Sequence, residues 1–196
     1  MIIGITGGSG AGKSYIAAIF AENGFKIIDA DAIAKDIMKN SRELKENIKK
    51  HFGDRFVLPD GLVDRRSLGQ VVFADSEKRK LLNSLTHPEI LAEISRQAKL
   101  YKNAVLDVPL LIGSGIESLC DVTVAVLAEK KYRIERIVKR DGITEETALN
   151  RINSQLSDEE YIKGTDLHIY NNGNEDEIRK QIIDIIKRYK ESDCTC

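Results

Sequence analysis

Residues 7–14 read GGSGAGKS and follow directly on the apolar run MIIGIT, residues 1–6. Glycine reaches backbone conformations that a Cβ would obstruct, so closely spaced glycines let several N–H groups face one anion. The pattern G-x-x-x-x-G-K-[ST] also brings the Lys13 ammonium within reach of β- and γ-phosphates and places the Ser14 hydroxyl where it can ligate Mg²⁺. We therefore predict an ATP-binding loop made of Gly8, Ser9, Gly10, Ala11, Gly12, Lys13, Ser14 and Tyr15.

The residues on either side of this loop have the patterns of a strand and a helix. Residues 2–6 form a β-type apolar run, and the apolar residues after Lys13 recur at helical spacing. A helix that begins near Lys13 directs the positive end of its dipole at a bound phosphate. This order of strand, loop and helix favours a nucleotide-binding P-loop over the alternative, a flexible glycine turn.

The composition is that of a globular protein without a charge bias. Of the 196 residues, 42% are hydrophobic and 31% charged, enough to bury one α/β domain with an inserted subdomain. The net charge of −1 offers no general attraction to nucleic acid, and no apolar stretch approaches the roughly 20 residues of a membrane span. We expect a cytoplasmic monomer that binds neither nucleic acid nor membranes. The three cysteines suit neither a disulfide framework nor a zinc site, and Cys194 and Cys196 are expected in a frayed tail.

Five apolar runs alternate with helical patterns and predict an α/β fold. Continuous apolar strands of this kind form a parallel sheet with helices on both faces, and ligands bind beyond the carboxyl ends of the strands. The predicted strands are residues 2–6, 25–28, 104–110, 122–127 and 167–170. We therefore expect the P-loop NTPase fold, with a five-stranded parallel sheet flanked by helices.

The predicted second and third strands are too far apart in the sequence for a single crossover. The residues between them show the periodicity of short helices at 32–38, 43–51, 65–73, 77–85 and 88–101. We expect one domain with a core (1–30, 104–128 and 165–196), a helical acceptor-binding insertion (31–103) and a lid (129–164). Structural padding is the alternative role of the insertion.

The segment after the fourth predicted strand is rich in basic residues. Residues 129–140 read EKKYRIERIVKR, and a turn at Asp141-Gly142 and a helix at 144–155 follow. Arginines on a mobile helical hairpin can close over phosphates and exclude water, so we predict a lid in which Arg140 is catalytic. A solvated helix face is the alternative, and it is the interpretation that we favour for the three lysines of this stretch.

Two carboxylates follow the second predicted strand, and a third, Asp107, belongs to the third predicted strand. An acceptor hydroxyl is a poor nucleophile until a base takes its proton, and we expect Asp29 or Asp31 to be that base. The alternative makes Asp31 a helix N-cap and Asp29 the partner of a lysine. Asp107 is expected to hold Mg²⁺ through water. No glutamate follows Asp107 and N-K-x-D is absent, which argues against ATP-hydrolysing motors and GTPase switches.

Together these residues resemble the dephospho-CoA kinase family over nearly the whole chain. The resemblance rests on IGITGGSGAGKS, IDADAIA, LVDRRSLGQVVF, LTHPEI, VLDVPLL and KRDGITEETALNRINSQLS, in that order. It implies an enzyme that uses ATP and Mg²⁺ to phosphorylate the ribose 3′-hydroxyl of dephospho-CoA, giving ADP and CoA.

The resemblance also implies roles for single residues. Asp31 matches the family's general base at the substrate, and Arg140 matches its lid arginine. Arg65, His87 and Pro88 match a helical region that holds the acceptor, although His87 beside Pro88 could also cap a helix. The departures are Tyr15 for a threonine, Ile112-Gly113 for Phe-Glu, and Tyr170-Asn171-Asn172-Gly173 for Asp-Asn-Ser-Gly. They put in doubt a hydroxyl contact to the α-phosphate and the way in which adenine is framed.

Two other functions stay open at this point. Another small-molecule kinase, acting on a nucleoside, a nucleotide or a sugar acid, would carry the same P-loop, and only the inserted region favours the CoA precursor. A nucleotide-responsive regulatory protein without an acceptor is the second. Asp29 and Asp31 argue against it, because a sensor needs no base beside the phosphates.

Overall fold

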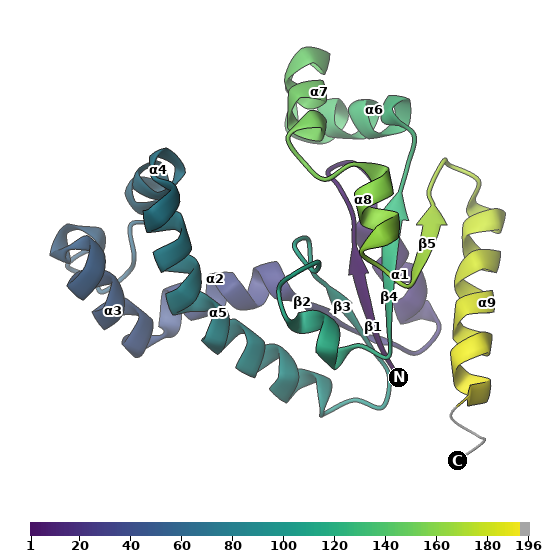
Figure 1. Cartoon of the computed structure of the whole chain (residues 1–196), viewed down its shortest axis with the longest axis horizontal. Helices are drawn as coiled ribbons and strands as arrows, with labels where there is room; N and C mark the ends of the chain where they lie inside the picture. The colour runs from purple at the N-terminus through teal and green to yellow at the C-terminus, as the bar shows by residue number, and fades with distance from the viewer. Residues whose placement is uncertain (193–196) are drawn as a thin grey trace. The chain divides into compact units, whose positions relative to one another are not determined.

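The computed structural model describes residues 1–192 and divides into two compact units (Figure 1). The core unit comprises Met1–Asp29 and the chain from Ala98 onward, and the helical unit comprises Ala30–Gln97. Cys194 and Cys196, which we expected in a frayed tail, lie outside the described residues. The two units are described separately below.

The core unit contains one five-stranded sheet in the order β2-β3-β1-β4-β5, and all neighbouring strands are parallel. Its strands are β1 (Ile2–Thr6), β2 (Lys26–Asp29), β3 (Ala104–Asp107), β4 (Val122–Leu127) and β5 (Leu167–Tyr170). The prediction of a five-stranded parallel sheet with the P-loop NTPase fold is confirmed. Because β1 is the central strand, the loop that follows it lies in the middle of the carboxyl edge, where such sheets bind ligands.

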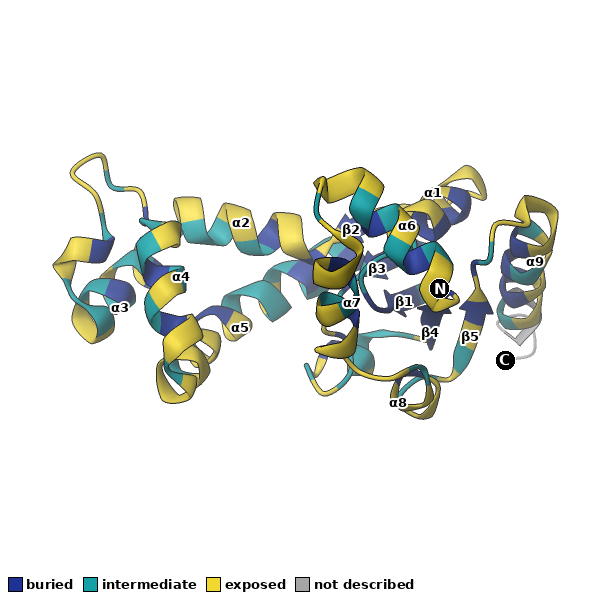
Figure 2. Ribbon diagram, turned by 90° about the horizontal axis from the view of Figure 1, so that it is seen from above, coloured by how far each residue is buried: buried dark blue, intermediate teal, exposed yellow. Residues whose placement is uncertain are grey.

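Side chains alternate between the two faces of the sheet, and helices cover both. On one face, Val124 packs with Phe20 of α1 (Lys13–Glu22) and Ile182 of α9 (Glu175–Ser192), all within 1% of full burial. On the other, Leu127 packs with Tyr161 of α8 (Asp158–Lys163). Figure 2 shows the strands as the buried centre of this unit and α9 with one buried and one exposed side. The core therefore fixes the strand ends that carry the site.

Two further helices of the core unit follow β4, namely α6 (Lys130–Asp141) and α7 (Glu145–Asn153). They share a small apolar core of Ile137, Ala148 and Ile152. Gly142, with φ 65°, ends α6 in the left-handed conformation, so the turn predicted at Asp141-Gly142 is confirmed. A short 3₁₀ helix, η2 (Ile116–Leu119), precedes β4.

The helical unit has its own apolar core. Its elements are α2 (Ala30–Asn40), α3 (Arg42–Phe52), the 3₁₀ helix η1 (Asp54–Phe56), α4 (Arg65–Ala74) and α5 (Ser76–Ala98). The buried side chains of this core are Leu44, Ile48, Phe56, Val63, Leu68 and Val72. Since that core is separate from the one beneath the sheet, the unit packs as a body of its own.

The two helices predicted at 77–85 and 88–101 are one continuous helix, α5, which runs through Pro88. A proline inside a helix removes one N–H donor and favours a break, which is why the prediction was wrong. The Thr86 hydroxyl, which is buried, bonds the carbonyl of Leu82 (3.0 Å) one turn before, and Leu82 and Leu85 pack on the unit's apolar core. These contacts before Pro88, and the full burial of Ile94 after it, therefore outweigh the tendency of proline to break the helix.

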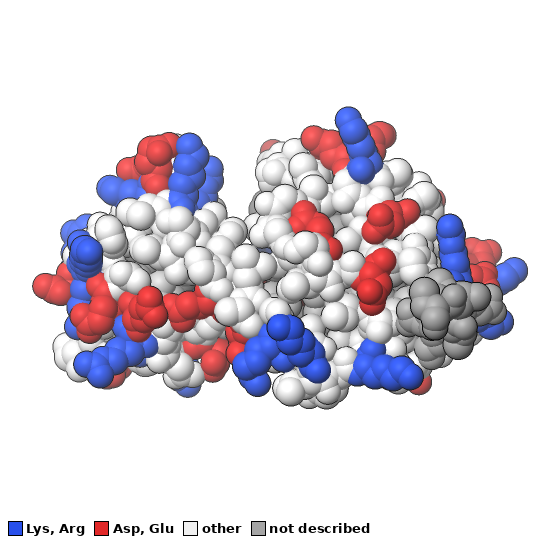
Figure 3. Space-filling view, turned by 60° about the horizontal axis from the view of Figure 1, so that its bottom comes forward, with Lys and Arg blue, Asp and Glu red and all other residues white. Residues whose placement is uncertain are grey.

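The strand predicted at 104–110 ends at Asp107. Pro109 has no N–H to donate to a neighbouring strand, and the residue before a proline is sterically restricted, so the ladder stops there. None of the helices in residues 1–192 combines the length and the hydropathy that a bilayer span requires. On the face shown in Figure 3, basic and acidic side chains lie interspersed.

Candidate active site

The loop between β1 and α1 turns at glycines with positive φ. The φ angles are 148° at Gly7, 76° at Gly10 and 92° at Gly12, conformations that L side chains rarely adopt. The Ala11 N–H donates to the Gly8 carbonyl across the loop at 3.1 Å. Directly after the loop, the first turn of α1 directs its N–H groups and its dipole to the place where an anion would bind.

Close neighbours are a second reason for these glycines. An added Cβ at Gly10 would lie 2.5 Å from the carbonyl oxygen and 2.8 Å from the Cα of Arg133 in α6. Added Cβ atoms at Gly8 and Gly12 would overlap Arg133 Nη2 and Asn171 Nδ2, respectively. We expected glycines here because the loop binds an anion. The structure adds a second reason: Arg133 and Asn171 pack against the loop and leave no space for a Cβ atom.

Three consecutive carbonyl groups of the loop accept hydrogen bonds from these neighbours. The bonds are Arg133 Nε to Ser9 (3.0 Å), Arg136 Nη1 to Gly10 (3.2 Å) and Asn171 Nδ2 to Ala11 (2.8 Å). In a planar trans peptide, the C=O of one residue and the N–H of the next point in opposite directions. The N–H groups of Gly10 and Gly12 therefore face away from α6 and Asn171, which is the orientation that phosphate binding requires.

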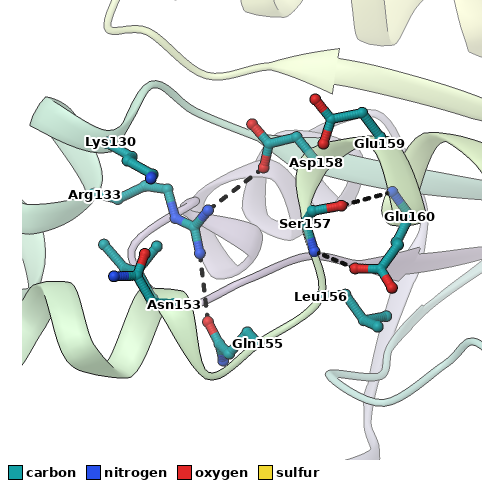
Figure 4. Close-up of a pocket in the computed structure, with 10 residues that line it drawn as sticks. Lys130, Arg133, Asn153, Gln155, Leu156, Ser157, Asp158, Glu159 and Glu160 are labelled. Carbon is teal, nitrogen blue, oxygen red and sulfur yellow. Dashed lines mark hydrogen bonds and ion pairs between the residues drawn. The ribbon is translucent and has the colours of Figure 1, made fainter.

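Arg133 is the buried member of this set. Its side chain is 5% exposed, and its Nη1 lies 3.5 Å from Asp158 Oδ1 (Figure 4). Burial lowers the pKa of its guanidinium, and the Asp158 carboxylate opposes that shift. A buried cation is tolerated where acceptors replace its water, and here the Ser9 carbonyl and Asp158 do so.

Lys13, Ser14 and Tyr15 form the first turn of α1. Lys13 Nζ donates to the Gly7 carbonyl at 3.0 Å, so its ammonium lies folded over the loop. Ser14 and Tyr15 are exposed. A hydroxyl at this point of a P-loop is a hard oxygen donor of the kind that Mg²⁺ prefers, so Ser14 fits the ion that we expected there.

A pocket of about 300 Å³ adjoins the loop. Its lining residues are Gly12, Tyr15, Arg136, Asn171, Gly173, Glu175 and Ile178. Arg136 Nη2 donates to the backbone oxygen (2.9 Å) and to Oδ1 (3.2 Å) of Asn171, which fixes the planar guanidinium at the pocket wall. Planar polar groups beside an apolar side chain suit a flat heteroaromatic ring next to the phosphate site.

Asp29 and Asp107 lie at the ends of adjacent strands. Asp29 is in register with Asp107, and Asp107 is in register with Ile5, one residue before the end of β1. Both carboxylates therefore lie at the sheet edge from which the P-loop departs. A half-buried carboxylate at this edge, Asp107, also fits a Mg²⁺ ion held through water.

Asp31 lies two residues beyond β2, exposed, in the first turn of α2. The alternative that made it a helix N-cap is wrong, because α2 already begins at Ala30. An ionised carboxylate in the first turn of a helix is stabilised by the helix dipole. By position in the chain, Asp31 belongs to the helical unit and Asp29 to the core unit.

Arg140, the predicted lid arginine, is bonded to Asp141. Its Nε and Nη2 donate to the two carboxylate oxygens at 2.7 and 3.0 Å, and Arg151 Nη1 donates to the same carboxylate. These bonds, that of Arg140 first, lower the pKa of Asp141 to about 2. The Arg140 side chain is 61% exposed, so this cluster joins α6 to α7 at the surface.

The predicted acceptor residues lie in the helical unit. Arg65 is exposed and is the first residue of α4, whose N-cap Asp64 accepts from Ser67 N (3.0 Å) and Ser67 Oγ (2.6 Å). His87 and Pro88 are exposed in the middle of α5, so the helix-cap alternative for His87 is wrong. A cation in the first turn of a helix opposes the helix dipole, so local stability does not account for Arg65.

Sequence analysis did not single out Arg133, Arg136 or Gln155, and it treated Asn171 only within a departure from the family. Arg133 and Arg136 are three residues apart and share one face of α6, but Arg140, four residues after Arg136, shares that face as well, so helical spacing does not separate them. The P-loop partners of Arg133 and Arg136 lie more than 100 residues away in the sequence, so periodicity alone does not reveal the contacts.

A family model and curated relatives resemble the chain over most of its length. The family model for dephospho-CoA kinase matches residues 1–177. A dephospho-CoA kinase of Fusobacterium nucleatum is 40% identical over 184 residues, which cover 93% of this chain and 95% of that protein. This coverage shows that the resemblance extends over both units.

Two solved structures are similar over the whole chain. TT1252 from Thermus thermophilus has a TM-score of 0.79 and 31% identity, covering 96% of this chain and 97% of that one. Dephospho-CoA kinase from Campylobacter jejuni has a TM-score of 0.70 and 29% identity, covering 98% of both chains. Of the functions left open by the sequence, these matches support the kinase. The chain belongs to the dephospho-CoA kinase family, and it is an ATP-dependent kinase that transfers phosphate to a hydroxyl group.

Proposed function

We propose that the protein transfers the γ-phosphate of ATP to the ribose 3′-hydroxyl of dephospho-CoA, giving ADP and CoA. The observation that carries the proposal is the convergence of the P-loop, Asp29 and Asp107 at one edge of the sheet. The family relationship supports dephospho-CoA as the acceptor. We further propose that the protein acts in the cytoplasm as a monomer.

The P-loop binds the phosphates in this proposal. The N–H groups of Gly10 and Gly12 and the first turn of α1 donate to phosphate oxygens, with their orientation already set by the bonded carbonyls. Lys13 exchanges the Gly7 carbonyl for a phosphate oxygen. Donors that are held in place before the reaction need no reorganisation as charge develops on the transferred group.

Ser14, and Asp107 through water, would hold Mg²⁺. When bound, the ion would offset the charge that develops on the transferred phosphoryl group. The pocket beside Tyr15 and Arg136 would receive the adenosine part of ATP. Its planar guanidinium and its amide then select for a flat polar base.

The acceptor half of the proposal rests on the helical unit. Asp31 orients the ribose hydroxyl and accepts its proton as the oxygen attacks the γ-phosphorus. Arg65, His87 and Pro88 bind the acceptor, and the unfavourable position of Arg65 in its helix supports such a role. Arg140, on a lid formed by residues 129–164, exchanges Asp141 for a phosphate oxygen when ATP is bound.

The acceptor is tested by measuring ADP release from Mg-ATP with dephospho-CoA, AMP, a simple nucleoside or no acceptor. ADP that appears only with dephospho-CoA, together with a product that carries one added phosphate, supports the proposal. Release with another acceptor keeps the kinase and rejects this substrate. Equal slow release in all four samples rejects the transfer reaction.

The base is tested by Asp31→Asn, with Asp29→Asn as the matched control. We expect Asp31→Asn to lower kcat by about a hundredfold or more and to leave the Kd for ATP largely unchanged, because a base acts only on the acceptor. Asp29→Asn should have the smaller effect on kcat. A larger loss in Asp29→Asn would assign the base to Asp29 instead.

A further inference from the structure

All three polar groups of Ser9 are bonded to the segment 129–164. Ser9 N donates to Gln155 Oε1 at 2.8 Å, Gln155 Nε2 donates to Ser9 Oγ at 3.1 Å, and Arg133 Nε donates to the Ser9 carbonyl at 3.0 Å. We had expected Ser9 to contact ATP, yet in this structure its N–H and hydroxyl are both paired with Gln155. Gln155 therefore has a specific contact that the proposed chemistry does not use.

Gln155 is itself held in place. It lies two residues after the end of α7, where its N–H donates to the Ile152 carbonyl at 3.2 Å. Arg133 Nη2 approaches its Oε1 at 3.4 Å, as Figure 4 shows, and Arg133 is in turn bonded to Asp158. The side-chain amide is thus fixed from both sides, by Arg133 and by Ser9, at the wall of a pocket of about 490 Å³.

The bonds to Ser9 set the direction of two neighbouring peptide groups. Arg133 holds the Ser9 carbonyl, which turns the Gly10 N–H to the opposite side. Gln155 holds the Ser9 N–H, and the Gly8 carbonyl of the same peptide then accepts the Ala11 N–H across the loop. Without Gln155, the peptide between Gly8 and Ser9 keeps only the bond from the Ala11 N–H, and Arg133 loses the acceptor that faces its Nη2.

We propose that Gln155 is a positioning residue for phosphoryl transfer: it does not touch ATP, but holds the peptide between Gly8 and Ser9 and the Arg133 guanidinium, whose bond to the Ser9 carbonyl sets the phosphate-binding direction of the Gly10 amide. The inference rests on the proposed binding of ATP phosphates by the P-loop. It also accounts for the placement of a glutamine between α7 and α8, far from the acceptor residues in the sequence.

The test compares two substitutions that remove an amide from the wall of the same pocket. Gln155→Met keeps the length of the side chain and removes both bonds to Ser9. Asn153→Leu is the matched control, because no bond joins Asn153 to the P-loop among the described contacts. Gln155→Glu keeps an oxygen that accepts the Ser9 N–H and serves as the conservative variant. For each protein, kcat, KM for dephospho-CoA, the Kd for ATP without acceptor, and Tm are measured.

We expect Gln155→Met to lower kcat about tenfold to a hundredfold, the effect of a misplaced donor, with KM for dephospho-CoA unchanged and Tm equal to that of Asn153→Leu. Gln155→Glu should stay within about threefold of the wild-type kcat. Unchanged kcat and unchanged Kd for ATP in Gln155→Met overturn the proposal. An equal loss of kcat in Asn153→Leu, or in Gln155→Glu, overturns it as well, because the effect would then not follow the bond to the Ser9 N–H.

The proposed function can fail independently of this inference. If the wild-type protein does not phosphorylate dephospho-CoA, the Kd for ATP still reports on the loop. A Kd for ATP that rises about threefold or more in Gln155→Met, but not in Asn153→Leu, then supports the positioning role. An unchanged Kd in Gln155→Met rejects it.

Discussion

Helix α6 carries three arginines, and the first two, Arg133 and Arg136, have different surroundings from the last, Arg140. Arg133 and Arg136, towards the start of the helix, bond P-loop carbonyls, and the Arg133 side chain is 5% exposed. Arg140, at the other end, bonds Asp141 and is 61% exposed. The sequence shows one basic stretch, whereas the structure shows a scaffold at one end and a surface cluster at the other.

Hydration explains the difference between the two groups. A buried guanidinium has lost its water and depends on the acceptors around it, so Arg133 cannot leave Ser9 and Asp158 without a large cost. An exposed ion pair is worth little, because water competes for both partners. Arg140 can therefore exchange its carboxylate for a phosphate, and Arg133 cannot. We therefore propose loop geometry as the role of Arg133 and Arg136, and transition-state contact as the role of Arg140.

The largest effect on kcat and stability should come from obstructing the close contact between α6 and the P-loop. Gly10→Ala places a Cβ against the backbone of Arg133 at a residue with φ 76°. We expect kcat to fall by about a thousandfold, since the Gly10 donor is misplaced, and the free energy of unfolding to fall by more than about 2 kcal/mol. Steady-state kinetics and urea unfolding measure the two effects.

Gly24→Ala is the control for Gly10→Ala. Gly24 has a similar φ of 88°, but no atom lies within 4 Å of an added Cβ. The free energy of unfolding of this variant should fall only by the cost of the dihedral angle, about 1–2 kcal/mol, and its kcat should stay unchanged. Equal losses of stability in the two variants would show that the contact with Arg133 is unimportant, and would break the distinction between the ends of α6.

The next effect concerns the exposed end of α6. Arg140→Ala should lower kcat by about a hundredfold, the usual loss for one donor to a developing charge, with the Kd for ATP and Tm little changed. A lower kcat with unchanged Kd and Tm would show that Arg140 acts during phosphoryl transfer, in contrast to the structural role of Arg133. A Tm loss as large as that of Gly10→Ala, with kcat preserved, would instead make Arg140 a structural residue.

The smallest effect is expected from the carboxylate that holds Arg140. The pKa of Asp141 is lowered from 3.8 to about 2 in the folded protein, so its ionised form stabilises the fold. That contribution is complete above pH 3.8 and is lost as the pH falls towards 2. Asp141→Asn should therefore lower Tm by about 1–2 °C at pH 7, with the difference from wild type shrinking towards pH 2. A difference that persists at pH 2 would show that charge is not the cause.

The strands predicted at 2–6, 122–127 and 167–170 coincide with β1, β4 and β5. In β1 and β4 a buried apolar run was enough to define the strand, whereas β5 is an edge strand with a single buried residue, Ile169. The prediction failed at Pro88 and at Pro109, where a single proline had to be weighed against its neighbours. Inside α5, packing prevailed over the proline, and at the end of β3 the proline prevailed.

The candidate site divides in the same way. The sequence by itself determined the P-loop, with Lys13 and Ser14 at the start of a helix, and the carboxylates at the carboxyl ends of β2 and β3, because these features depend on short-range spacing. Only the tertiary structure decided that Arg133, Arg136, Gln155 and Asn171 hold the loop while Arg140 does not. The reason is physical: helical periodicity assigns a side chain to a face, but hydrogen bonds to residues more than 100 positions away depend on how the elements pack.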